Sequence, residues 1–345
     1  TRRVSHSPRQ PVSNEPVVIT ALVTDPDGVD SVTLSYQLVR AGAYFGRYLK
    51  YNQNGTVNLD PAYDRGWVDL PMTDDGQGDD EEAGDGVHTG TVPFNVNRNR
   101  YLVRYRITVE DAGGSSVQVP YEDDPQSNFA YFVYNGTPDW RGEIREGDPP
   151  VTYPGELMSS IPTYFLLSKS SWVDESQFGG YGGSEYLWPG TLVYEGRVYD
   201  HIRYRPRGGV HRFQFGKNFW KFDFNRGHRF QARDEYGNEY DTKWSKLNFS
   251  SIVQQVNFQH RGEQGLFEGV GFRLFELCGV EASKTHHVQF YVIDQSRPER
   301  SQYGTDYYGL FLAVEQLDGQ FLDEHDLPDG NLYKIEGHSG ESNNQ

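Results

Sequence analysis

Basic residues cluster in one stretch of a chain that is otherwise acidic. The 345-residue chain has a formal net charge of −17, yet nine lysines and arginines and a single acid, Asp223, lie between Arg203 and Arg233. Arginine and lysine pair with phosphate oxygens, so anion recognition would explain the cluster. Pairing with acidic patches elsewhere in the protein would explain it equally well, and composition does not separate the two.

A glycine turn lies inside this basic stretch. It reads Arg205-Pro206-Arg207-Gly208-Gly209 and directly follows a predicted strand. Glycine lets backbone amides approach a phosphate closely. The turn matches neither a Walker loop nor GxGxxG, so it is a weak motif by itself.

A second part of the stretch predicts a strand with a functional lysine. Strand alternation places aromatic residues on one face and four others on the opposite face: Lys217, Phe219, Lys221 and Asp223. A lysine on an apolar strand cannot be freely solvated and usually has an assigned partner. Glu268, in the first turns of a predicted helix, is a candidate partner, because kinases hold phosphates with a strand lysine paired to a helix glutamate.

Residues 265–278 form the clearest predicted helix. Apolar residues recur in it with helical spacing, which indicates a core-facing side. They are Leu266, Val270, Leu274 and Leu277. Gly279 stands where a helix-terminating glycine belongs. Cys278, the single cysteine, is predicted to be a small buried hydrophobe on this helix.

Residues 74–86 form an acidic, glycine-rich loop that contains no base. Its five aspartates are Asp74, Asp75, Asp79, Asp80 and Asp85. Carboxylates interleaved with glycine can wrap Ca²⁺, which takes roughly six to eight oxygen ligands, although the spacing does not fit an EF-hand. A solvated, self-repelling loop is the alternative. A bound ion would stabilise the loop rather than take part in chemistry.

The rest of the chain indicates strands and turns, since it contains 24 Tyr, 20 Phe and 38 Gly. Short alternating segments separated by turns predict a β-sandwich of immunoglobulin or fibronectin type over residues 15–136. Strands mixed with the helix predict an α+β domain over residues 191–335. The remaining segments are an extended arm at 1–14, a linker and lead-in at 137–190, and a polar tail at 336–345.

The C-terminal half resembles the CotH (spore-coat protein H) kinase family. The resemblance covers roughly residues 195–335, and the order and spacing of its pieces make it specific. The pieces are Ile202–Gly208, Lys217–Asn225, Lys246-Leu247-Asn248, Leu266–Val280, Tyr308–Asp318 and Asn331-Leu332-Tyr333-Lys334. The sequence departs from the family at Lys217-Asn218, where relatives often have two lysines, and at Pro206 in the glycine turn.

The resemblance implies an atypical protein kinase, secreted or exposed at the cell surface, that uses Mg-ATP. Residues 191–335 would then be a lobe like the N-terminal, nucleotide-binding lobe of a kinase. Arg205, Arg207 and Gly208 would belong to the phosphate-binding turn, and Lys221 or Lys217 would bind phosphates.

Other roles implied by the resemblance concern the adenine and the catalytic groups. Glu268 would orient the lysine, and Glu315, Gln316 and Leu317 would form the hinge that meets the adenine. The family's catalytic acids and second lobe would lie beyond residue 345. The phosphate acceptor would be Ser or Thr of an extracellular or surface protein.

A non-enzymatic extracellular adhesin or filament subunit that reuses the same scaffold, and forms a homo-oligomer or filament, is the rival interpretation. The acidic loop, the many tyrosines and the early end of the chain favour it. The net charge argues against a general nucleic-acid binder, and no apolar run approaches the roughly 20 residues of a transmembrane helix. Because the sequence begins with Thr1 and has no initiator Met, we expect that an export signal or a longer N-terminal portion has been removed.

Overall fold

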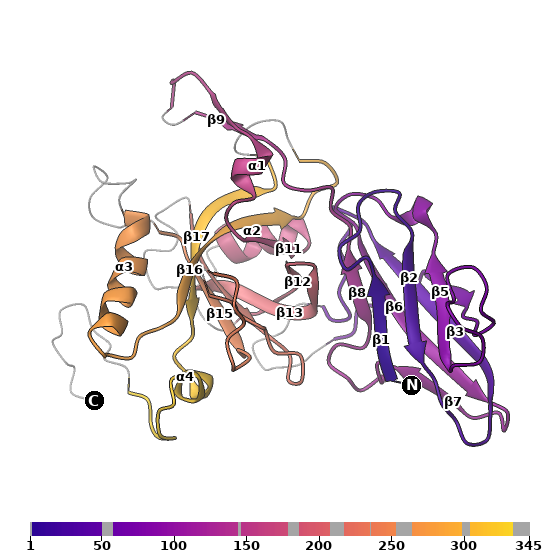
Figure 1. The fold of residues 1–345 in the computed structure, drawn as a ribbon. Coiled ribbons are helices and arrows are strands. Elements are labelled where there is room, and N and C mark those ends of the chain that lie inside the picture. The colour runs from indigo at the N-terminus through magenta and orange to yellow at the C-terminus, as the bar shows by residue number, and fades with distance from the viewer. Residues whose placement is uncertain are drawn as a thin grey trace.

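The computed structural model describes residues 2–49, 58–143, 146–178, 186–207, 217–234, 236–252, 264–298 and 304–333. Strands dominate these residues and form two packed regions, one from each half of the chain (Figure 1). The abundant tyrosine, phenylalanine and glycine account for this, because aromatic residues favour strands and glycine favours the turns between them.

The N-terminal half consists of two antiparallel sheets that share an apolar core. One sheet has the order β1-β2-β5, and the other has the order β4-β3-β6-β7 with β8 paired to β6. The core between them includes Ile19, Leu34 and Ile107. The elements are β1 (Arg2–Ser7), β2 (Val17–Leu22), β3 (Val29–Val39), β4 (Trp67–Pro71), β5 (Val87–Val92), η1 (Phe94–Val96), β6 (Leu102–Asp111), β7 (Ser116–Val119) and β8 (Phe129–Phe132).

The alternating sequence of these strands places every second side chain in that core. In β2, for example, Val17, Ile19 and Ala21 are buried while their neighbours are half-buried. β1, which comes from the expected extended arm, pairs antiparallel with β2. The immunoglobulin-like assignment of this half stays a prediction.

The C-terminal half is a closed barrel, which in the described residues has seven strands in the order β11-β12-β13-β14-β15-β17-β16. Neighbouring strands are antiparallel except β11 and β16, whose parallel pairing closes the barrel. The strands are β11 (Thr163–Leu167), β12 (Trp188–Tyr194), β13 (Arg197–Arg207), β14 (Phe219–Asp223), β15 (Lys246–Ser250), β16 (Thr285–Ile293) and β17 (Tyr307–Glu315). β11 lies in the segment expected to be a linker and lead-in.

Aromatic side chains fill the barrel. Trp220 and Phe222 of β14 contact Phe249 and Phe290 with ring centroids 5.0 to 5.2 Å apart, and all four side chains are buried. The sequence-based expectation of an α+β lobe like the N-terminal lobe of a kinase is therefore wrong. Closure depends on pairing β11 with β16, two segments far apart in the chain, and local sequence pattern does not reveal such a pairing.

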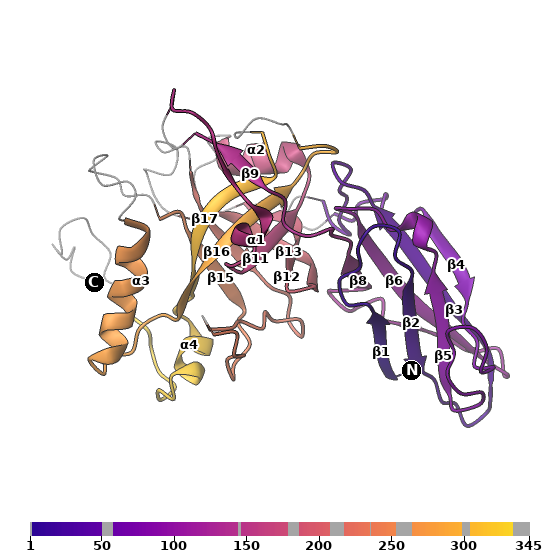
Figure 2. The same ribbon diagram turned by 45° about the horizontal axis from the view of Figure 1, so that its top comes forward.

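The helices lie outside the barrel and are few in the described part of the chain. They are α1 (Gly155–Met158), α2 (Ser170–Phe178), α3 (Gln264–Leu277) and α4 (Gly319–Glu324), and a short hairpin of β9 (Trp140–Gly142) and β10 (Val151–Tyr153) precedes α1. Figure 2 shows α3 on the side of the barrel away from the N-terminal half.

Helix α3 confirms the predicted helix but not its predicted orientation. Gly269 faces His287 of β16 and Leu312 of β17. The four apolar residues of the predicted core-facing side, Leu266, Val270, Leu274 and Leu277, are 51 to 68% exposed. Cys278 is exposed as well, so its predicted burial is wrong. Periodicity indicated a helix, but the helix turns its glycine side toward the barrel.

The two halves share one core. Val39, Leu102 and Phe132 of the N-terminal sheets belong to the same buried cluster as the barrel residues. Phe132 contacts Phe165 of β11 with ring centroids 5.2 Å apart. The N-terminal half is therefore packed against the barrel rather than tethered to it.

Candidate functional site

The outer surface of three barrel strands carries a group of cations, which we call the basic face. In β13 and β14, Arg203 pairs with Asp223 and Arg205 pairs with Lys221, and β15 continues these rows with Lys246 and Asn248. Directly paired residues of antiparallel strands point to the same side of a sheet. The cations of the basic face are Arg203, Arg205, Arg207, Lys221 and Lys246.

The pKa of Lys221 is lowered from its ordinary value by burial and by other positive charges that lie close to it. Burial lowers it most, and the nearby Arg205, Lys246 and Arg207 lower it further, whereas Asp223 raises it. Burial also lowers the pKa of Arg207. Several partly desolvated cations that repel one another favour the binding of an anion, because a negative charge between them removes the repulsion.

Two acceptor atoms on the same strands lack partners. Asp223 Oδ1 and Asn248 Oδ1 are buried and have no hydrogen-bond partner among the described residues. Buried polar atoms are nearly always hydrogen-bonded, so each calls for an explanation. A ligand with donor groups, or a cation held beside Asp223, would satisfy them.

Asn248 connects the basic face to the predicted hinge. Its amide Nδ2 donates to Gln316 Oε1 at 3.1 Å, just past the end of β17. Leu317 beside it is exposed. The backbone N–H of Glu315 already donates to Lys284 O, and its carboxylate accepts from Lys284 N. Backbone contacts to an adenine would therefore have to come from Gln316 and Leu317.

Lys217 does not lie with Lys221. It precedes β14, where its ammonium group donates to the carbonyl of Leu310 and lies 4.2 Å from the ring centroid of Phe311. Burial lowers the pKa of Lys217 to about 8. Of the two candidate lysines, only Lys221 belongs to the basic face.

Glu268 is also placed differently from the expectation. Its carboxylate accepts a hydrogen bond from Ser250 Oγ and lies close enough to Arg207 to raise the pKa of that guanidinium. The structure shows no ion pair between Glu268 and Lys221. Gly208, the remaining residue of the predicted phosphate-binding turn, lies outside the described residues.

The geometry thus groups Arg205, Lys221 and Asn248 with the edge at Gln316 on one outer surface. Residues 205–345 match the family model described as CotH kinase protein. The match covers less than half of the chain. It begins within β13 at Arg205, the first residue of the row Arg205, Lys221 and Asn248. No curated protein and no solved structure matches the chain.

The acidic loop lies outside the residues that match this family model, and its carboxylates accept hydrogen bonds from the loop and from the adjacent β5. Asp74 accepts hydrogen bonds from the backbone N–H groups of Gly84 and Gly86. Asp80 accepts from Gly76 N and Thr89 Oγ1. Asp75, Asp79 and Asp85 accept bonds in the same way, from Gln77 N, Thr91 Oγ1 and Val87 N.

Calcium binding at residues 74–86 stays a prediction, because the five aspartates of the loop are engaged in hydrogen bonds within the protein. In the part of the chain that the structure describes, no three His, Cys, Asp or Glu side chains are grouped so that they could hold a metal ion. The described helices also include none long and apolar enough to cross a membrane.

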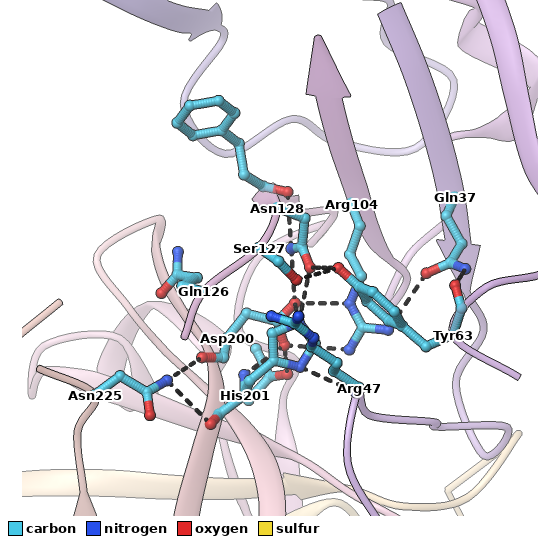
Figure 3. Close-up of polar contacts among 12 residues, drawn as sticks. Gln37, Arg47, Tyr63, Arg104, Gln126, Ser127, Asn128, Asp200, His201 and Asn225 are labelled. Atoms are coloured by element: carbon cyan, nitrogen blue, oxygen red, sulfur yellow. Dashed lines mark hydrogen bonds and ion pairs between the residues drawn. The ribbon is translucent and has the colours of Figure 1, made fainter. Parts of the chain in front are cut away.

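Sequence reasoning missed a buried polar cluster between the barrel and the N-terminal half, which we call the junction network (Figure 3). Asp200 of β13 accepts bonds from Arg104 Nε at 2.6 Å, Asn128 Nδ2 at 2.9 Å and Thr191 Oγ1 at 2.5 Å. Arg104 and Asp200 are fully buried. The Arg104 charge holds the pKa of Asp200 well below its usual range, against the effect of burial, which is the larger single influence.

His201 completes the junction network in its neutral form. The backbone N–H of Arg47 donates to its Nδ1, so Nε2 carries the proton and donates to Asn128 Oδ1 at 2.7 Å. Burial lowers the pKa of His201 to about 3. Its backbone is left-handed, with φ 54°. The adjacent Asp200 and His201 were the available signal in the sequence. The partner of Asp200, Arg104, comes from the other half of the chain, and no local pattern pairs the two.

Proposed function

We propose that this CotH-type protein is a kinase that holds the phosphates of ATP on the basic face of its barrel. The supporting observation is the row formed by Arg205, Lys221 and Asn248, which leads from the cations to the edge at Gln316. This row lies in the segment that matches the CotH kinase model. Phosphate oxygens would accept from the cations, while the orphaned Asn248 Oδ1 would accept from a ligand donor.

The barrel interior is not available for a nucleotide. Trp220, Phe222, Phe249 and Phe290 fill it, and each is at most 1% exposed. Cores of this kind are packed as densely as organic crystals and leave no space for a ligand. The nucleotide would therefore lie on the outer surface, where substrate hydroxyl groups can also reach it.

Magnesium would come with the nucleotide. Mg²⁺ is commonly held by one or two carboxylates together with substrate phosphates, and Asp223 provides a carboxylate with an unpartnered oxygen among the cations. ATP would supply the phosphoryl group for transfer to Ser or Thr of an extracellular protein. The protein itself would act outside the cell or at its surface, as the CotH match suggests.

Alanine at Lys221 tests this proposal. Charge-assisted hydrogen bonds contribute about 1.5–3 kcal/mol, so Lys221→Ala should weaken the binding of Mg-ATP by about tenfold or more in calorimetric titration. Arg98→Ala removes an exposed cation from the N-terminal half and should leave the affinity unchanged. Equal affinities for the wild type and Lys221→Ala, or no binding by the wild type, would reject the site.

A non-enzymatic role as an adhesin or filament subunit is the second candidate. The exposed apolar side of α3, which includes Leu266, Phe267 and Leu274, favours it, because exposed apolar patches often mark protein interfaces. Sedimentation with and without Mg-ATP separates the two roles. Assembly that is indifferent to nucleotide, in a protein that binds none, would favour the structural role.

A further inference from the structure

A cleft of about 500 Å³ lies between the N-terminal half and the barrel, away from the basic face. One wall comes from β1, β6 and β8, including His6, Tyr105 and Phe129, and the other from the barrel around Tyr199 and Arg229. Figure 1 shows β1 at the edge of the N-terminal sheets that faces the barrel. We call this space the junction cleft.

The lining of the junction cleft is basic. Among the described residues that line it there are six basic side chains and no carboxylate. They are His6, Arg9, Arg197, His228, Arg229 and Lys243. The protein has a net charge of −17, so the junction cleft is a second region of positive charge, separate from the basic face. The basic stretch of the sequence is thus divided between two surfaces.

Three described carboxylates near the cleft are already engaged. Glu239 binds Arg197 at 2.9 Å, Arg233 binds Glu195 at 2.8 Å, and His228 binds Asp124 at 2.6 Å. Arg9, Arg229 and Lys243 form no ion pair with the described residues. The cleft therefore presents three cations whose charge the described residues do not neutralise by direct pairing.

The surroundings of Arg9 agree with this. Burial lowers the pKa of its guanidinium, and the charges of Arg197 and Arg233 lower it further, whereas Glu195 acts in the opposite direction. The cations of the cleft thus repel one another. An anionic ligand would remove this repulsion, and nothing in the proposed nucleotide site depends on it.

We propose that the junction cleft binds a short acidic peptide segment of a protein partner. Arg197 and His228 in its lining already bind carboxylates, and Arg9, Arg229 and Lys243 extend that array. In the wall from the N-terminal half, the half-buried Phe129, which stacks on the buried Tyr105 at 5.3 Å, gives an apolar surface for side chains. A long nucleic acid would extend beyond the cleft onto a protein with a strongly negative charge, which would repel it.

Charge reversal in the full chain tests this inference. A fluorescent oligoglutamate peptide should bind the wild type at low salt and lose affinity as salt rises. The double variant Arg229→Glu/Lys243→Glu should weaken binding by about tenfold or more. The double variant Arg98→Glu/Arg141→Glu makes the same change of net charge at exposed positions outside the cleft, and it should bind like the wild type.

A third variant separates the cleft from the basic face. Lys221→Glu should impair Mg-ATP binding and leave oligoglutamate binding intact. The inference is overturned if the peptide does not bind, if the two double variants lose affinity equally, or if Lys221→Glu alone abolishes binding. It is also overturned if inorganic polyphosphate binds through Arg229 and Lys243 while oligoglutamate does not.

Discussion

Asp200→Ala is expected to lower the free energy of unfolding by about 3–5 kcal/mol, because it leaves the Arg104 guanidinium buried without its counter-charge. Both side chains are fully buried, and the Nε–Oδ2 distance is 2.6 Å. The carboxylate also accepts from Thr191 Oγ1 and Asn128 Nδ2, which would lose their acceptor. Urea unfolding of the purified full chain measures the change.

Two further variants identify the origin of that loss. Glu239→Ala removes the exposed ion pairs with Arg197 and Arg233 and should cost about 1 kcal/mol or less. The double variant Arg104→Met/Asp200→Ala should recover part of the loss, since it removes the stranded charge as well. A loss below about 1 kcal/mol in Asp200→Ala would show that the ion pair contributes little to holding the halves together.

Acid should destabilise the protein through two buried histidines. Burial lowers the pKa of His201 to about 3 and that of His286 to about 4, whereas the unfolded chain has the ordinary value of about 6.5. Below about pH 6.5 the unfolded chain binds protons that the folded chain does not, so stability falls with pH until about pH 4 for His286 and about pH 3 for His201. Each histidine should remove about 2 kcal/mol between pH 7.5 and 5.

Histidine variants isolate this effect from other titrations. Asp294, whose pKa burial raises to about 6, acts in the opposite direction over the same pH range. His201→Asn suits the left-handed backbone, because asparagine tolerates it well. The difference in unfolding free energy between pH 7.5 and 5 should shrink by about 2 kcal/mol in this variant. An unchanged difference would mean that His201 is protonated in the folded state or exposed to solvent.

The sequence predicted the strands better than their closure. The short alternating segments within residues 15–136 predicted strands such as β3 and β6, since one face of each strand packs on a core close by. The burial of Arg104 on the opposite face depends on the docked barrel, which no local pattern contains. Barrel closure likewise depends on β11 and β16, which are adjacent only after folding.

The candidate site was predicted in part. The basic residues and the lysine strand were visible in the sequence, and register now brings Arg205, Lys221 and Asn248 into one row. The expected partnership of Lys221 with Glu268 was not found, because the position of α3 depends on its packing against β16 and β17. Residue type indicated which side chains to consider, whereas their partners depended on tertiary contacts.

The parallel pairing of β11 with β16 distinguishes the segment that matches the family model from the longer segment that closes the barrel. The family match begins at residue 205, inside β13, and so excludes β11 and β12. A chain started there would leave β14 without most of its neighbour and β16 with a bare edge, and unpaired edges invite aggregation. The boundary of the match therefore cuts this protein through a hydrogen-bonded ring of strands, and a fragment that keeps the ring closed must reach back at least to Thr163.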